Sequence, residues 1–446
     1  MTLSEELGRL CSEDWRGRFG SQEQEALRAI VRTAFVDTSA CILSGRDEEP
    51  VRIAAQWAGA RFAPLEQSSI LFGPQRMSSA AAALVNAMAA HTLDYDDVAI
   101  AGHPSCVLMA ALWAEHERSG ASGFDLVQAY AKGYAVWGEL ARRMRGSLHA
   151  RGWHPTAVFG TVGAAAAVSA LRGLDANQAA HAIGIATSMA GGVIANFGSM
   201  AKALHAGKAA ESGIAAAELA QAGFTASPDA LDGKAGLLAA LLGPEHVDLA
   251  SGLPQDIART LLHTRPGIKK YPVCYAAHRV IDGVIDLTKA HGIEAHQVAR
   301  IHATISATTA GVLRRHAPQT VDEARFSLEF CLPAALVHGR LGLAEVSQAV
   351  LHEPAVRSLM PCIHTHTVDT SCPIEPSFAL NDQVTITLRD GRVLDSGPIR
   401  FARRHAQLPL NEAQLLEKLQ DCAGHGDHAL AARIELRISA ALRDSP

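Results

Sequence analysis

The stretch GSMAKALHAGKAAESGIAAAELAQAG, residues 198–223, decides the fold class of this chain. Alanine and glycine dominate it, and alanine is the strongest helix former among the amino acids. Small side chains let one helix approach another closely, so the stretch predicts a helix inside a packed bundle. Lys202 and His205 interrupt this pattern. They either face solvent or line a pocket for an anionic substrate, and the stretch alone leaves both possibilities open.

Helical spacing of apolar residues continues on both sides of this stretch, up to about residue 265. Within residues 122–140, Leu126, Tyr130 and Trp137 fall on one face of a helix. The spacing therefore predicts a helical bundle for the first part of the chain.

The pattern changes after residue 265. Residues 299–307 alternate between apolar and polar side chains, which predicts a half-buried strand. Residues 382–397 alternate in the same way and contain Asp390-Gly391, a hairpin turn signal. We therefore predict a mainly α fold, with a large all-helical domain formed by residues 1–265 and 401–446 and a smaller α+β domain formed by residues 266–400.

Composition excludes some classes of partner. The chain has 446 residues and a formal net charge of −5, which gives no electrostatic reason to bind nucleic acid or an anionic membrane surface. Its alanine-rich runs are too short to cross a bilayer. The eight cysteines form no CxxC pair, and the first residues lack the apolar core of a secretory signal. We expect reduced thiols and a cytoplasmic protein.

The densest group of chemically active residues is HTLDYDDVAIAGHPSC, residues 91–106. A carboxylate such as Asp94 beside an imidazole such as His103 fixes the tautomer of the ring and raises its basicity. The segment alone slightly favours another interpretation, in which a helix ends and a solvated acidic loop follows.

Two further segments contain candidate site residues. A second His-Pro pair, His154-Pro155, places a histidine where a helix begins. The segment GIKKYPVCYAAHRVIDG, at the predicted junction of the domains, contains Lys269, Lys270 and Cys274, and such junctions often bind ligands. Cys274 is either a thiolate stabilised by the lysines or a packed thiol.

Metal and phosphate sites have weak support. Asp94, Asp96, Asp97 and His103 contain suitable ligand atoms but follow no known metal-binding spacing. Neither a GxxxxGK[ST] nor a GxGxxG loop is present. We expect no metal.

Five stretches of the sequence carry a resemblance to known proteins. They are NAMAAHTLDYDDVAIAGHPS, WHPTAVFGTVGAAAAVSALRGL, GSMAKALHAGKAAESGIAAAELAQAGFTASPDALDGKAGLLAAL, KKYPVCYAAHRVIDGVIDL and EARFSLEFCLPAALVHGRL. Through these stretches the chain resembles the MmgE/PrpD family from about residue 25 to 400. The family includes 2-methylcitrate dehydratase, cis-aconitate decarboxylase and iminodisuccinate epimerase. The resemblance implies a large helical domain, a smaller α+β lid, a homodimer, and catalysis without metal or organic cofactor.

Position by position, the resemblance implies a pocket formed by Asp94, His103, His154, Lys202 and Lys269. The two histidines are expected to exchange protons with the substrate and Asp94 to orient one of them. The lysines are expected to hold substrate carboxylates. Further substrate-binding candidates are His205, Lys270 and Cys274.

The chain departs from the dehydratase and decarboxylase members at two positions. Cys274 stands where those members have a histidine, and Phe330 where they have a tyrosine. We predict a dehydratase-type lyase that acts on a small di- or tricarboxylic acid by moving a proton next to a carboxylate. The alternatives are a dicarboxylate epimerase, a decarboxylase of a cis-aconitate-like acid, and a family member that binds without catalysis.

Overall fold

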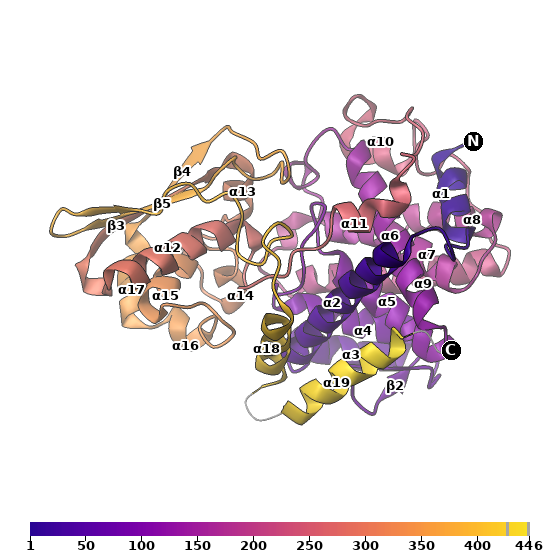
Figure 1. Cartoon of the computed structure of the whole chain (residues 1–446), viewed down its shortest axis with the longest axis horizontal. Helices are drawn as coiled ribbons and strands as arrows, with labels where there is room; N and C mark the ends of the chain where they lie inside the picture. Colours follow the sequence, from indigo (N-terminus) through magenta and orange to yellow (C-terminus); the bar gives the residue numbers. More distant parts are fainter. Residues whose placement is uncertain (425–427, 444–446) are drawn as a thin grey trace.

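The computed structural model describes residues 1–424 and 428–443, and the fold is mainly α as predicted (Figure 1). Helices follow one another through the first part of the chain. They are α1 (Leu3–Ser12), α2 (Ser21–Gly45), α3 (Glu49–Arg61), α4 (Ser79–Thr92), α5 (Pro104–Ser119), α6 (Gly123–Arg143), α7 (Pro155–Leu171), α8 (Ala176–Thr187), α9 (Ala201–Gln221), α10 (Leu237–Leu242) and α11 (Thr260–His263), with a short ribbon of β1 (Ser68–Ser69) and β2 (Arg76–Met77).

Small residues bring helix α9 close to its neighbours α7 and α4. A Cβ atom at Gly213 would lie 2.4 Å from the Cβ of Ala164, and one at Gly207 would lie 2.5 Å from the Cγ of Met88. Real side chains never approach so closely, so only glycine fits at these two crossings. The helix predicted from residues 198–223 is confirmed as a packed central helix.

A smaller α+β part follows, at the left of Figure 1. Its sheet has the order β4-β3-β5-β6, in which β3 and β4 run parallel and the other pairs antiparallel. Its elements are α12 (His278–His291), β3 (Val298–Ser306), α13 (Ala307–Val312), α14 (Val321–Ala324), α15 (Leu328–His338), α16 (Gln348–Leu351), α17 (Pro354–Leu359), β4 (Ile363–Val368), β5 (Gln383–Leu388) and β6 (Val393–Asp395).

The alternating patterns of the two predicted strand segments are confirmed. Ile301, Ala303 and Ile305 of β3 are fully buried. Gly391, in the turn between β5 and β6, has a φ of +89°, which favours glycine. The sheet therefore buries one face, as the period of two in the sequence requires.

Each part has its own hydrophobic core. The buried members of the helical core lie between Leu3 and Leu261 and between Leu415 and Leu442. Those of the second core lie between Tyr271 and Leu388, joined by Phe197 from the helical part. The domain boundaries drawn from the sequence stay a prediction.

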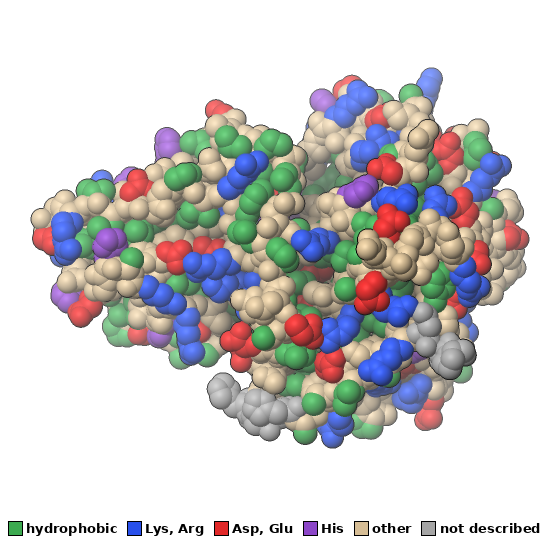
Figure 2. All heavy atoms as spheres, in the orientation of Figure 1, with side chains coloured by type: hydrophobic (Ala, Val, Ile, Leu, Met, Phe, Trp, Pro, Cys, Tyr) green, Lys and Arg blue, Asp and Glu red, His purple; other side chains and the backbone are tan. Residues whose placement is uncertain are grey.

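The last helices, α18 (Glu412–Ala423) and α19 (His428–Ala441), pack on α2, and α18 lies where the two parts meet (Figure 1). Residues 425–427 and 444–446 of the predicted C-terminal helical segment lie outside the described residues. Among the described helices, none has the length and apolar character needed to cross a bilayer. Acidic and basic side chains are interspersed over the face drawn in Figure 2.

Candidate active site

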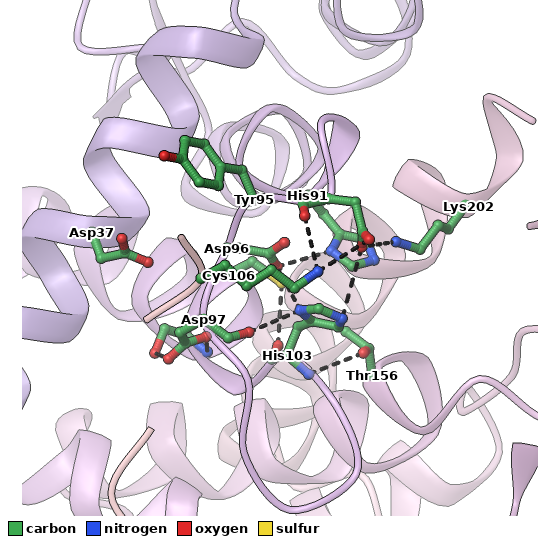
Figure 3. Close-up of polar contacts among 12 residues, drawn as sticks. Asp37, His91, Tyr95, Asp96, Asp97, His103, Cys106, Thr156 and Lys202 are labelled. Atoms are coloured by element: carbon green, nitrogen blue, oxygen red, sulfur yellow. Dashed lines mark hydrogen bonds and ion pairs between the residues drawn. The ribbon is translucent and has the colours of Figure 1, made fainter. Parts of the chain in front are cut away.

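Four helix ends converge beneath the smaller part of the molecule. Helix α4 ends at Thr92, His103 is the N-cap of α5, His154 is the N-cap of α7, and Lys202 lies in the first turn of α9. Proline at the first position of α5 and of α7 suits a helix start because that N–H needs no partner. The N-terminal ends of α5, α7 and α9 are the positive ends of their helix dipoles and favour an anion at this place, whereas α4 presents its negative C-terminal end. Figure 3 shows Lys202 reaching from its helix toward His91 and His103.

The loop between α4 and α5 is folded inward, and its acidic residues are buried. Asp94, Asp96 and Asp97 are each at most 3% exposed. The sequence analysis slightly favoured a helix end followed by a solvated acidic loop. The helix does end here, but the prediction that the loop is solvated is wrong. Asp94 has a φ of +53°, a left-handed conformation that aspartate tolerates better than most residues. The fold holds Asp94 in this conformation through the contacts of its own side chain and carbonyl group.

Two lysines hold Asp94. Lys202 forms a hydrogen-bonded ion pair with Oδ1 of the carboxylate, and the Nζ of Lys269 lies 3.0 Å from Oδ2. Lys202 is only 6% exposed, so the solvent-facing alternative is wrong. Burial alone would raise the pKa of Asp94, but the two ammonium groups outweigh burial and hold this pKa well below its usual range. Asp94 is therefore a carboxylate at neutral pH.

His103 is a neutral imidazole in a fixed tautomer. Its Nδ1 lies 2.8 Å from the carbonyl oxygen of Asp97, and because a carbonyl only accepts, Nδ1 carries the proton. The backbone N–H of His103 donates to Thr156 Oγ1. Burial lowers the pKa of His103 to about 3. Its Nε2 therefore keeps a lone pair, 3.9 Å from Oδ1 of Asp94 and free to accept a proton.

His91, which the sequence analysis did not select as a site residue, stands at the centre of this group. Its Nδ1 donates to Asp96 at 2.8 Å, and its ring stacks on His154 with centroids 5.5 Å apart. Its Nε2 is buried and has no partner among the described residues. The sequence could have identified His91 through its spacing from Asp94, because the two residues are three positions apart and both lie where one helix ends.

His154 and His205 form a second imidazole pair. Their Nδ1 atoms lie 3.0 Å apart, so one ring donates and the other accepts. Burial, with smaller contributions from His91 and Lys202, holds the pKa of His154 well below its usual range and lowers that of His205 to about 4. Both rings are neutral near pH 7, and the Nδ1 proton of one ring lies in the hydrogen bond between them.

A small pocket opens to solvent beside Asp94 and Lys202. Both parts of the molecule line it, with Ser199 from the helical part and Arg325 and Phe326 from the smaller part. The Nζ of Lys202 lies 5.1 Å from the ring centroid of Phe326, a cation–π contact across the pocket wall. The pocket therefore lies between the two parts. The sequence analysis did not predict Arg325 as a site residue.

The remaining predicted site residues lie elsewhere or serve other contacts. Lys269 is fully buried and donates to the carbonyl oxygens of Asp94 and Val273 at 2.9 and 3.2 Å. The Nζ of Lys270 lies 3.9 Å from Asp282 and is not brought to the imidazole group. Burial, with Asp94 adding to it, raises the pKa of Cys274 to about 11. The thiolate alternative for Cys274 is therefore not supported.

A cation site is conceivable at the loop, because ligand atoms of His91, Asp94, Asp96 and His103 lie within 4.8 Å of one another. The two carboxylates already have partners from the protein, whereas Nε2 of His91 has none among the described residues. Asp94 binds two ammonium groups, and Asp96 accepts from His91. A divalent ion at this place would lie beside the ammonium groups of Lys202 and Lys269, and the repulsion between these positive charges would weaken its binding.

The chain matches known proteins over most of its length. Residues 18–250 match the MmgE/PrpD N-terminal domain and residues 271–444 the MmgE/PrpD C-terminal domain. The chain is similar to cis-aconitate decarboxylase of Homo sapiens, with 29% identity over 86% of this chain and 81% of that protein. The corresponding protein of Mus musculus is 31% identical over 77% of this chain and 72% of its own length. A cis-aconitate decarboxylase-like protein of Aspergillus oryzae is 26% identical over 73% and 70%. This chain belongs to the MmgE/PrpD family.

Proposed function

We propose that this protein is a lyase that acts on a small di- or tricarboxylic acid. The observation that carries the proposal is the meeting of a neutral His103 with the ammonium group of Lys202 at the carboxylate of Asp94, beside a pocket open to solvent. A neutral imidazole has a lone pair that can accept a proton, and an ammonium group stabilises negative charge that develops next to a carboxylate.

Each side chain has a distinct part in this proposal. His103 Nε2 exchanges the proton at the reacting carbon. Lys202 holds a substrate carboxylate, and Asp94 keeps Lys202 in place until substrate arrives. The His154–His205 pair supplies or stores a second proton. Lys269 positions Asp94, because all of its acceptors belong to the protein, in place of the substrate contact that the sequence analysis predicted.

Within the lyases, we propose a carboxy-lyase rather than the hydro-lyase that the sequence analysis ranked first. The support comes from relatives named cis-aconitate decarboxylase that match most of the chain. In decarboxylation the C–C bond to the departing carboxylate breaks, CO2 leaves, and the electron pair stays on carbon next to a carboxylate held by Lys202. This carbon then takes a proton either from Nε2 of His103, after that atom has taken one up from solvent, or from the Cys274 thiol, which solvent then reprotonates.

An epimerase finds less support. It needs bases on both faces of the reacting carbon, and the raised pKa of Cys274 keeps this residue a thiol. Cys274 and Phe330 differ from the residues of the dehydratase and decarboxylase members. These two differences are compatible with a natural substrate other than cis-aconitate.

One experiment tests the proposal. Purified protein is incubated with cis-aconitate in deuterated water and followed by NMR. We expect methylenesuccinate carrying one deuteron per turnover, together with CO2, and a loss of about 100-fold or more in kcat/KM for Lys202→Met. Hydroxylated products would favour a hydro-lyase, and deuterium exchange without net reaction an epimerase. No reaction and no exchange with any di- or tricarboxylic acid would contradict a lyase and favour a binding protein.

We also propose, from the family resemblance, that the protein is a homodimer. Light scattering on the eluted peak of a sizing column is expected to give twice the chain mass of 47.1 kDa. A peak at the mass of one chain would contradict this expectation.

A further inference from the structure

Arg325 and Asp322 are the charged residues of the pocket wall that the proposed mechanism does not use, and the surroundings of Arg325 are unusual. Arg325 follows α14 and is only 6% exposed. Its Nη1 donates to Asp322 at 2.7 Å. Its Nε is buried and has no partner among the residues that the structure describes. Leaving a guanidinium N–H unpaired in a buried place is costly unless a ligand completes it.

The place of Arg325 in the pocket suggests what that ligand is. Arg325 and Lys202 line the same pocket, one from each part of the molecule, and Lys202 contacts the ring of Phe326. Asp94 is already paired with Lys202 and Lys269, and Asp322 occupies only one end of the guanidinium. The pocket wall therefore holds two separate cationic groups, and each is paired with one carboxylate of the same wall, Lys202 with Asp94 and Arg325 with Asp322.

We propose that Arg325 binds a second carboxylate of the substrate while Lys202 holds the first. This inference rests on the proposed function, because it assumes that the acid enters this pocket. The fork of a guanidinium matches the two oxygens of a carboxylate, and such charge-assisted pairs are stronger than neutral hydrogen bonds. Arg325 would thus select acids with two or more carboxylates. A monocarboxylic acid leaves the buried Nε unpaired and binds more weakly.

The test uses two ligands of the same size that do not react, succinate and succinamate, in which a neutral amide replaces one carboxylate. Their affinities are measured by calorimetry for the full-length protein. The wild type is expected to bind succinate at least tenfold more tightly than succinamate. Arg325→Met should lose tenfold or more in succinate affinity and less than twofold in succinamate affinity. The control Arg300→Met removes an exposed arginine of β3 in the same part of the molecule and should change neither.

Several outcomes would overturn the inference. One is a wild type that binds both ligands equally. Another is an Arg325→Met variant that keeps its succinate affinity, or one that loses both ligands equally, as expected for a purely structural pair with Asp322. If Arg325→Met fails to fold, Arg325→Lys keeps the charge but loses the fork and should weaken succinate alone, by severalfold.

The experiments distinguish a failure of the proposed lyase activity from a failure of the proposed role of Arg325. Turnover of cis-aconitate that does not depend on Arg325 leaves the proposed function standing and removes this inference. Selectivity for succinate that depends on Arg325, without turnover of any acid, supports this inference and contradicts the lyase.

Discussion

The Nζ of Lys269 lies 2.9 Å from the carbonyl oxygen of Asp94 and 3.0 Å from its carboxylate oxygen Oδ2. One ammonium group thus holds both the main chain and the side chain of a residue whose φ is +53°. A left-handed aspartate persists at a site only when surrounding contacts determine it. Lys269 supplies those contacts from a segment 175 residues away in sequence.

Replacing Lys269 should therefore misplace Asp94 without removing a substrate contact. We expect Lys269→Met to lower kcat by about 100-fold, while the affinity for succinate changes much less than in Lys202→Met. Steady-state kinetics and calorimetry on both variants check this split, with the exposed Lys289→Met as the control. If Lys269→Met lost succinate affinity as completely as Lys202→Met, Lys269 would contact substrate directly.

The buried neutral histidines make stability depend on pH. The pKa of His103 is lowered by burial from 6.5 to about 3, so below pH 6.5 the unfolded chain takes up a proton that the folded protein refuses. Stability is therefore lost as pH falls from about 6.5 toward 3, by up to roughly 4 kcal/mol for this group alone. His103→Gln should flatten the fall in unfolding free energy measured by urea denaturation between pH 7 and 4.

The matched control for this pH effect is the exposed His296→Gln, whose side chain is 75% exposed. Its stability profile should follow that of the wild type. An unchanged profile in His103→Gln would show that His103 is charged, or solvated, in the folded protein.

Activity should not depend on a divalent metal. The carboxylates of Asp94 and Asp96 are occupied by Lys202, Lys269 and His91, and an ion would have to displace these partners. We expect full kcat/KM after prolonged dialysis against EDTA, measured with metal-free buffers. A loss of activity that Zn²⁺ or Mg²⁺ restores would mean that the four-residue group of the loop is a metal site.

Helix α18 reaches the site through Lys418. This fully buried lysine donates to the carbonyl oxygens of Tyr95 and Lys269 at 2.8 and 3.1 Å and pairs with Asp37 at 2.6 Å. Lys418→Met should destabilise the protein by about 3–5 kcal/mol, because it leaves Asp37 buried and unpaired. Asp37→Asn combined with Lys418→Met should recover part of this loss.

Chemical denaturation of the single and double variants measures this coupling. An exposed lysine, Lys289, replaced by methionine provides the control for removing a charge. Losses that simply add in the double variant would mean that Asp37 and Lys418 do not stabilise one another in the folded state.

The sequence determined the local structure of this protein. The small residues of 198–223, the alternation in 299–307 and the two His-Pro pairs each act within a few residues, through propensity, periodicity and the missing N–H of proline. The helix, the strand and the two histidine N-caps follow from them. The resemblance to a family also singled out Asp94, His103, His154 and Lys202, which the structure brings together.

Only the tertiary structure decided which charges meet and how deeply they are buried. The loop after α4 appears acidic and hydrophilic in the sequence, yet it is buried because Lys202, Lys269 and Lys418 arrive from distant segments to pair with it. The same assembly gives His91 a central place, keeps His103 neutral and brings Arg325 into the pocket. The burial and the pairing of these charges depend on residues more than a hundred positions apart in sequence, and a local sequence pattern does not predict such contacts.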